Sequence, residues 1–192
     1  MGKVYDGINE QIQAWIAEQE MFFIATAPLS GDGSVNLSPK GLDTLRVLDD
    51  HTLVFLDTGG SGIETISHVR ENGRIVVMMC ALRDPPVTYR FHGRGTVILP
   101  GDEGFDTLAA LFDRSQFGVR AIICIDVTRV SDSCGYGVPL YDFRGQRDLL
   151  AEDIQSTGRE KFVAQFAEMW TTSIDGLPGL TPEESATFMG PG

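Results

Sequence analysis

Positively charged residues are scarce in this chain of 192 residues: Lys and Arg total 15 against 27 Asp and Glu, a formal net charge of −12. Such a balance repels nucleic-acid phosphates unless the few cations gather on one face. Long hydrophobic runs are also missing, since stretches such as 75–79 fall far short of the roughly 20 apolar residues that cross a bilayer. The N-terminal stretch MGKVYDGINEQ has no apolar signal core. We therefore expect a cytoplasmic protein with no nucleic-acid partner and no membrane span.

The chain has only three cysteines and three histidines. The cysteines form no C-x-x-C pair and the histidines share no ligand spacing, so we expect neither disulfides nor a metal site. Cys80 and Cys124 lie within apolar strand-like runs and are expected to be buried. On a helix over 63–71, His68 is expected to point away from the apolar face, toward solvent.

Alternating hydrophobic patterns dominate the first 130 residues and are typical of β-strands. Strand-like runs occupy 21–27, 35–41, 45–50, 51–57, 74–82, 87–99 and 119–130. No helical pattern separates the first four runs, which excludes a doubly wound parallel sheet. Helical spacing occurs at 8–19, 63–71 and 102–112, and again from 146 onward. We therefore predict a mainly β (α+β) antiparallel barrel with peripheral helices, in a single domain over 1–192 with its barrel core at 20–130 and a helical C-terminal extension at 146–192.

Polar residues line one side of the strand-like stretch VNLSPKG. In an extended chain Asn36, Ser38 and Lys40 share a face, while the residues between them point the other way. Lysine occurs only three times in the sequence, so one beside Ser and Pro suggests contact with an anion. Pro39 donates no ladder hydrogen bond and places the strand at an edge. The alternative is the solvated end of a hairpin.

A glycine-rich loop, TGGSG at 58–62, precedes the helix expected at 63–71. Glycines let successive backbone N–H groups point at one ligand, and a helix N-terminus adds partial positive charge, so the loop favours a phosphate. The alternative is a capping box, because Ser61 and Glu64 have the S-x-x-E spacing in which the side chains take those donors.

Arginines accompany these two features. Arg46 lies on the strand after VNLSPKG, and Arg90 and Arg94 share one face of a later strand. A planar guanidinium suits phosphate. Each arginine alone is more commonly solvated or ion-paired. A phosphate site is favoured by the order along the chain: the strand with the polar face, the strand that carries Arg46, the glycine-rich loop and the helix.

The stretches VNLSPKG, LRVLDDHTLVFLDTGGSG, ETISHVRENGRIVVMM and YRFHGRGTVI together resemble the pyridoxamine 5′-phosphate oxidase-like family of FMN-binding split barrels. The resemblance covers about residues 20–130, and the later motifs DSCGYGVP and SIDGLPGL resemble one uncharacterised branch of that family. It implies a six-stranded antiparallel split β-barrel, a homodimer, and FMN in a groove at the dimer interface.

The resemblance also assigns residues to the cofactor. Lys40 and Arg46, with a contribution from Arg90, would hold the FMN phosphate. Residues 56–58 would lie beside the ribityl chain and the isoalloxazine ring, and Ser61 would belong to the loop that follows. The full set of expected cofactor-binding residues is Asn36, Ser38, Lys40, Arg46, Asp57, Thr58, Ser61, Gly62, Arg90 and Trp170.

Trp170 enters this set because a C-terminal Trp approaches the FMN in the oxidase. Its ring is expected to extend beyond the apolar face of the helix before it, and the segment 170–180 to pack over the partner's cofactor groove. The alternative is a tail that covers the surface of its own barrel.

We therefore predict an FMN-dependent oxidoreductase that moves a hydride between FMN and a small organic substrate. The motif SIDGLPGL replaces the Arg-Leu-x-Pro tail of the oxidase proper, which predicts a substrate other than vitamin B6. No residue is assigned as catalytic acid or base. The alternatives are a non-catalytic flavin, deazaflavin or haem binding protein on the same barrel, and a barrel that has lost its cofactor.

Overall fold

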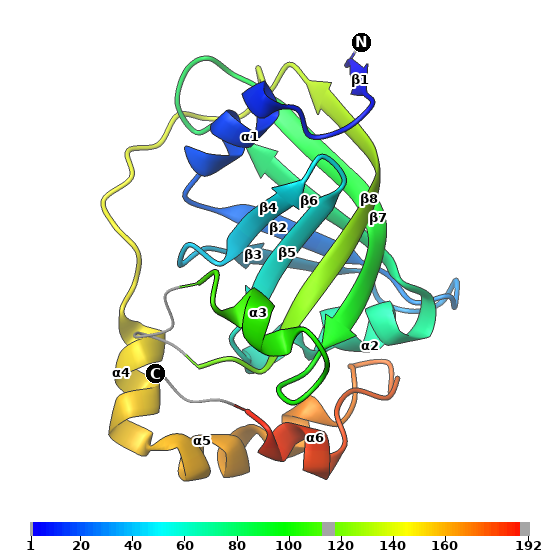
Figure 1. Cartoon of the computed structure of the whole chain (residues 1–192), viewed down its shortest axis with the longest axis vertical. Coiled ribbons are helices and arrows are strands. Elements are labelled where there is room, and N and C mark those ends of the chain that lie inside the picture. Colours follow the sequence, from blue (N-terminus) through cyan, green and yellow to red (C-terminus); the bar gives the residue numbers. More distant parts are fainter. Residues whose placement is uncertain (1, 113–117, 189–192) are drawn as a thin grey trace.

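The computed structural model describes residues 2–112 and 118–188 and consists of an antiparallel barrel with one helix, α1 (Glu10–Ala17), at one end and the other helices toward the opposite end (Figure 1). The strands within these residues are β1 (Val4–Tyr5), β2 (Phe22–Thr26), β3 (Asn36–Lys40), β4 (Leu45–Asp49), β5 (Thr52–Asp57), β6 (Arg74–Cys80), β7 (Thr88–Ile98) and β8 (Ala121–Ser133). The helices are α1 (Glu10–Ala17), α2 (Ile63–Asn72), α3 (Phe105–Ala109), α4 (Leu149–Thr157), α5 (Arg159–Phe166) and α6 (Pro182–Ala186), with single 3₁₀ turns η1 (Gly60–Gly62) and η2 (Glu168–Trp170).

The sheet follows the order β3-β2-β6-β7-β8-β5-β4, and β1 pairs with β8. Each neighbouring pair is antiparallel, so the predicted antiparallel barrel with peripheral helices is confirmed. All seven strand-like runs of the sequence form strands, and the short β1 is an eighth, so the described sheet has two strands more than the six that the resemblance implied. The two ends of the order, β3 and β4, face the open side that we call the seam.

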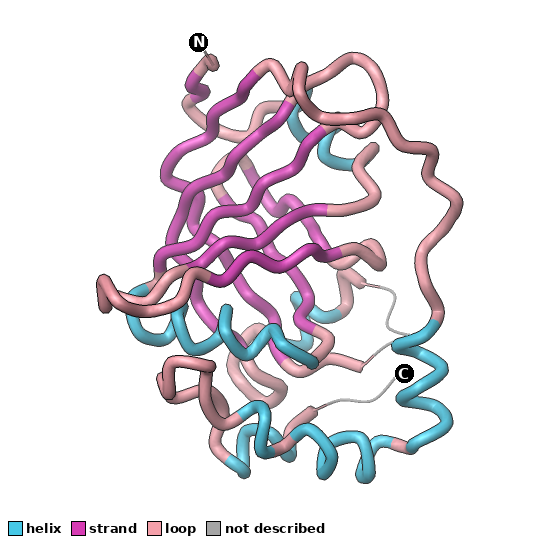
Figure 2. Tube along the Cα trace, turned by 180° about the vertical axis from the view of Figure 1, so that it is seen from behind, coloured by secondary structure: helices cyan, strands magenta, loops and turns pink. Residues whose placement is uncertain are grey.

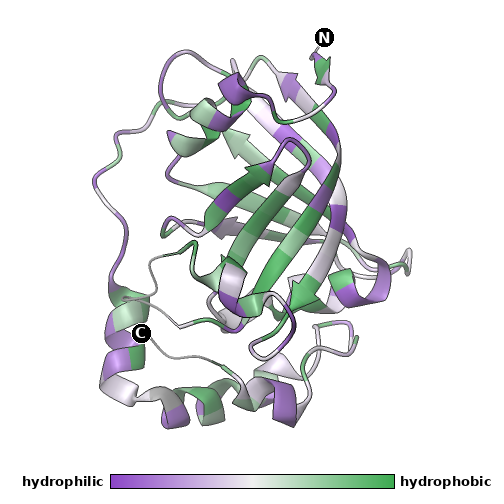
Figure 3. Ribbon diagram, viewed as in Figure 1, coloured by the Kyte–Doolittle hydropathy of each residue, from purple (hydrophilic) through white to green (hydrophobic). Residues whose placement is uncertain are grey.

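The alternation of the sequence fixes which face of each strand enters the core. In β7, Tyr89 and Phe91 are buried while Arg90 and His92 lie on the outer face, as predicted. Figure 3 shows apolar residues along the strands that enclose the interior. The prediction that β6 is buried on both faces is wrong: from Ile75 onward its residues alternate between buried on the inner face and half-buried on the outer face.

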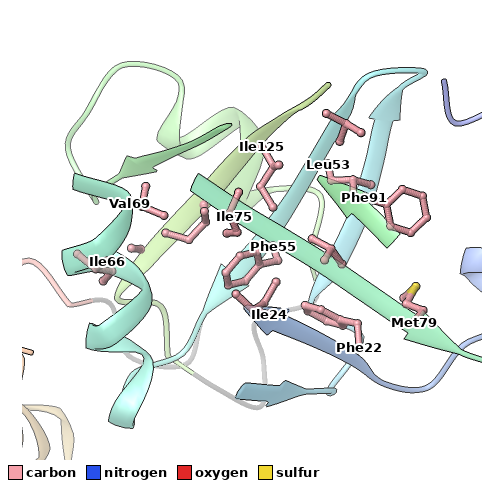
Figure 4. Packing of buried hydrophobic residues seen from close by; sticks show 14 of the residues in the cluster. Phe22, Ile24, Leu53, Phe55, Ile66, Val69, Ile75, Met79, Phe91 and Ile125 are labelled. Carbon is pink, nitrogen blue, oxygen red and sulfur yellow. The ribbon is translucent and has the colours of Figure 1, made fainter. Parts of the chain in front are cut away.

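The barrel core joins side chains from both halves of the sheet. Phe22 and Phe55 pack edge to face with their ring centroids 5.9 Å apart, and Ile66 of α2 closes one end (Figure 4). Cys80 and Cys124 are half-buried rather than buried, because both point to the outer side of the sheet. The exposed Cys134 lies beyond the end of β8.

Local signals set the helix ends. Asn9 caps α1 by accepting a hydrogen bond from the Ile12 N–H at 2.9 Å, and Gly73 ends α2 at a φ of 71°, which suits glycine. The turn-rich end of the chain contains α6, which the pattern did not predict. A capping box between Thr181 and Glu184 begins this helix.

The C-terminal helices α4 to α6 lie toward the same end of the barrel as α2, and α6 is tied to α2 by the ion pair of Glu184 with Arg70 (Figure 1). They are reached by an irregular stretch over 134–148, which we call the connector. The connector runs along the side of the barrel from the end of β8 to the start of α4 (Figure 2). Across 2–112 and 118–188, the helices are all too short or too polar to traverse a bilayer.

We expect Phe55→Ala to lower the free energy of unfolding by about 3–5 kcal/mol, because it removes a fully buried ring from the middle of the core. Urea unfolding monitored by circular dichroism measures this change. Leu29→Ala, at a side chain that is 66% exposed, is the control and should stay within about 0.5 kcal/mol of wild type. Equal effects of the two substitutions would contradict this description of the core.

Candidate functional site

A buried carboxylate joins the two sides of the seam. Asp57, at the end of β5, is 2% exposed and accepts a hydrogen bond from Arg120 Nε at 2.7 Å. Lys40, at the end of β3, places its Nζ 3.5 Å from the other carboxylate oxygen of Asp57. Arg120 is itself 1% exposed and donates from Nη1 to the carbonyl of Gly60 at 3.0 Å. We call Lys40, Asp57 and Arg120 the seam triad.

The seam triad fills the space beneath the glycine-rich loop. A Cβ atom at Gly62 would come within 2.4 Å of Asp57 Oδ1 and 2.8 Å of Arg120 Nη2, so only glycine fits there. The capping-box alternative is not formed, since no side chain caps α2 at this end. Instead Glu64 Oε1 accepts a hydrogen bond from the backbone N–H of Ile174 at 2.8 Å. The chain's own charged side chains therefore occupy this end of α2, while Ser61 stays exposed and Thr58 half-buried.

Trp170 covers the seam triad from the C-terminal side. Its ring is fully buried, and the guanidinium of Arg120 lies 5.1 Å from the ring centroid, a cation–π distance. The expectation that this ring extends outward is wrong, because Phe162, Phe166 and Phe188 surround it. The packing of the segment 170–180 over a partner's groove stays a prediction, and it rests on exposed residues such as Ile174.

The polar face of β3 is confirmed, and two of its members bond inward. Asn36 Nδ2 donates to Thr26 Oγ1 and to Thr65 Oγ1, both at 3.0 Å, and Ser38 Oγ donates to Asn36 Oδ1 at 2.9 Å. These bonds tie the edge strand to β2 and α2. Lys40 is the member of the row that reaches the seam.

His68 belongs to the same internal network, and its predicted exposure is wrong. The side chain is fully buried, with Nδ1 2.9 Å from Thr26 Oγ1 and Nε2 4.0 Å from a carboxylate oxygen of Glu64. Both sides of α2 are covered, one by the barrel and the other by the C-terminal segment that Glu64 contacts. A helix covered on two sides buries residues that a one-sided pattern places in solvent.

The other two predicted cations lie elsewhere on the sheet. Arg46, on β4, is held by Asp43 at 2.8 Å and lies over the ring of Phe112. Arg90, on the outer face of β7, donates to Ser133 Oγ at 3.0 Å. Because β8 and β5 separate β7 from β4, one chain does not bring Lys40, Arg46 and Arg90 together.

Lys40 instead lines a groove of about 900 Å³ between the barrel and the connector. Barrel residues along it are Glu20, Met21, Phe23, Pro39, Lys40, Gly41, Leu42, Cys80, Leu82 and Arg83. The opposite wall comprises residues 141–147 with Leu149 and Leu150. We call this space the connector groove.

The connector groove combines an apolar floor with a basic rim. Burial raises the pKa of the Cys80 thiol, against the effect of the Arg90 charge, so this group is an uncharged part of the floor. Four cations line the groove, namely Lys40, Arg83, Arg144 and Arg147, against the carboxylates of Glu20 and Asp142. Sequence reasoning missed this site because the connector has no periodicity. The pair of arginines in FRGQRD, rare in so acidic a chain, was the available signal.

Comparison with known proteins gives consistent matches. A family model described as pyridoxamine 5′-phosphate oxidase matches residues 8–134. The chain is 33% identical over 192 aligned residues to the pyridoxamine 5′-phosphate oxidase family protein ustO of Aspergillus flavus, covering 92% of this chain and 77% of that protein.

Solved structures match the barrel. HupZ from Group A Streptococcus superimposes with a TM-score of 0.55 at 22% identity, over 66% of this chain and 99% of HupZ. A candidate pyridoxamine 5′-phosphate oxidase from Lactobacillus delbrueckii gives a TM-score of 0.51 at 15% identity, over 66% of this chain and 94% of that one. These matches confirm the split-barrel fold.

We expect Asp57→Asn to destabilise the protein by about 3–5 kcal/mol, because it leaves the buried Arg120 charge without a counter-charge. Chemical denaturation measures the loss. Asp43→Asn is the matched control, since Asp43 pairs with Arg46 but is 80% exposed, and it should cost less than about 1 kcal/mol. If Asp57→Asn unfolds at the same denaturant concentration as wild type, the seam triad does not hold the barrel.

Proposed function

The chain belongs to the pyridoxamine 5′-phosphate oxidase family, and from this premise we propose that it is an FMN-dependent oxidoreductase acting on a small organic substrate. When bound, FMN supplies the hydride-transfer chemistry, and the protein supplies binding, orientation and access. The observation that carries the proposal is the connector groove, in which an apolar floor meets the lysine expected at the cofactor phosphate.

The residues of the connector groove fit a flavin. A flat aromatic ring needs an apolar surface, which Met21, Phe23 and Pro39 provide, and a phosphate needs cations. Lys40 can contribute positive charge, because its ammonium pairs with Asp57 at 3.5 Å, a distance longer than that of a direct hydrogen bond. Asp57 is already bonded to Arg120, so it orients Lys40 without consuming its three donors.

One feature of the C-terminal segment supports a substrate other than vitamin B6. The SIDGLPGL segment lacks the arginine with which the oxidase's tail would bind a vitamin phosphate. The exposed turn within it, around Ile174, is held by two hydrogen bonds from Ser34 to Asp175. A turn fixed in this way presents a defined surface to a substrate or to a partner chain. A cytoplasmic address stays a prediction.

We also propose a homodimer, since part of the outer face of the sheet carries apolar residues that remain exposed or half-buried. Leu37 is 63% exposed on β3, next to Pro39, and the outer residues of β6 are half-buried. Exposed apolar patches on a soluble protein mark interaction surfaces. A two-fold axis lets the same patch serve both protomers.

Lys40→Ala should weaken FMN binding about tenfold or more, because a charge-assisted contact contributes roughly 1.5–3 kcal/mol. Titration of FMN followed by its fluorescence measures the dissociation constant. Lys161→Ala is the matched control, since Lys161 is an exposed lysine on α5, and it should bind FMN like wild type. Unchanged affinity in Lys40→Ala would contradict the assignment. An absorption spectrum of the purified protein distinguishes flavin from haem.

Light scattering of the wild-type protein should give about twice the chain mass of 21.0 kDa. Leu37→Asp should shift the protein toward the monomer, because it places a charge in the proposed contact. Leu48→Asp, at an exposed leucine on β4, is the control and should remain dimeric. A wild-type mass of one chain at working concentration would rule the dimer out.

A further inference from the structure

We infer that Arg144 and Arg147, two arginines of the connector, bind the phosphate group of the ligand in the connector groove. This inference rests on the proposed flavin function and adds a location for the phosphate. Three observations support it: the hydrogen bonds that hold the connector to the barrel, the charges in the groove, and the side chains that fill the space under Gly62 at the start of α2.

Hydrogen bonds join the connector to the barrel at two places along the groove. At one end, the backbone N–H of Tyr141 donates to the carbonyl of Leu82 at 2.9 Å. At the other, Gln146 Nε2 donates to the carbonyl of Glu20 at 3.0 Å, and Gln146 Oε1 accepts from the N–H of Leu42 at 3.1 Å. A Cβ on Gly41 would lie 2.9 Å from Gln146 Oε1, so the Gln146 side chain approaches the backbone of residue 41 closely.

This anchoring determines where the two arginines sit. Arg144 lies between the fastening points and Arg147 directly follows the second, so both are held at the groove that they line. A connector bound only at its ends to β8 and α4 would leave these residues without a fixed place. Instead, three hydrogen bonds to backbone groups of the barrel hold this part of the connector, and the two arginines with it, against the groove.

The four cations that line the groove differ in whether a carboxylate lies beside them. Arg83 is paired with Glu20, and Lys40 faces Asp57. Arg144 and Arg147 are exposed and make no hydrogen bond or ion pair with any residue of 2–112 or 118–188. In a chain with a net charge of −12, two cations without a carboxylate partner create a local site for an anion. The guanidinium fork matches the oxygens of a phosphate.

At the N-terminus of α2, the alternative position for a phosphate, the space under Gly62 is filled by the chain's own side chains. Asp57 and Arg120 occupy the space under Gly62, and a Cβ on Gly59 would lie 3.3 Å from the ring of Trp170. A phosphate in the space under Gly62 would face the carboxylate of Asp57, which repels it. The connector arginines offer the anion positive charge with no carboxylate paired to them.

The test compares FMN with riboflavin, which has the same ring and no phosphate. Arg144→Ala and Arg147→Ala should each weaken FMN binding about tenfold and leave riboflavin binding within twofold of wild type. The matched control is Arg129→Ala, which removes an exposed arginine of β8 outside the groove and should change neither affinity. Binding to the full-length protein is followed by flavin fluorescence, with thermal melting to confirm that each variant is folded.

Other results would contradict either the proposed function or the phosphate assignment, and the two cases can be told apart. Wild-type protein that binds neither flavin overturns the proposed function, and the phosphate assignment with it. Wild-type protein that binds FMN, with both variants binding it equally well, overturns the assignment alone. Variants that lose FMN and riboflavin to the same extent also overturn it, since the arginines would then shape the groove rather than contact the phosphate.

Discussion

The seam triad is the constraint on which the other features of this structure depend. Removing a carboxylate and a guanidinium from water is costly, and the cost is offset only when the pair is tightly bonded. The bonded pair of Asp57 and Arg120 meets this condition at the open side of the barrel. Gly62 makes room for the pair, Trp170 covers it, and Lys40 of β3 forms an ion pair with its carboxylate.

Much of the barrel could be predicted from the sequence, because each strand is specified by local alternation. The face of β7 and the inward row on β3 follow from a period of two residues. The partners of a buried charge have no such local signal. Arg120 is 63 residues from Asp57, and in the sequence it reads as the flank of an apolar strand. His68 was misplaced for the same reason, since its helix is covered by a segment more than 100 residues away.

The candidate site also has one part with a local sequence signal and one part without. Lys40 could be predicted, because a rare lysine on a polar strand face is visible in the sequence. The connector groove could not, because it depends on where an irregular stretch crosses the sheet. Gln146 and Gly41 are 105 positions apart, and their contact is a property of the folded chain alone. The fold is therefore that of the family, while the groove depends on a segment beyond residue 134, where the family match ends.

The contact between Arg120 and Trp170 has a consequence for the order in which the chain matures. During synthesis Arg120 leaves the ribosome fifty residues before the aromatic ring that covers it. Until then the barrel strands can pair, but the guanidinium has water on one side. The seam is therefore completed late, only after α4 and α5 have been made. A growing chain that stalls in that interval leaves Arg120 without the ring that covers it. The incompletely packed barrel is then accessible to the chaperones and proteases that act on nascent proteins.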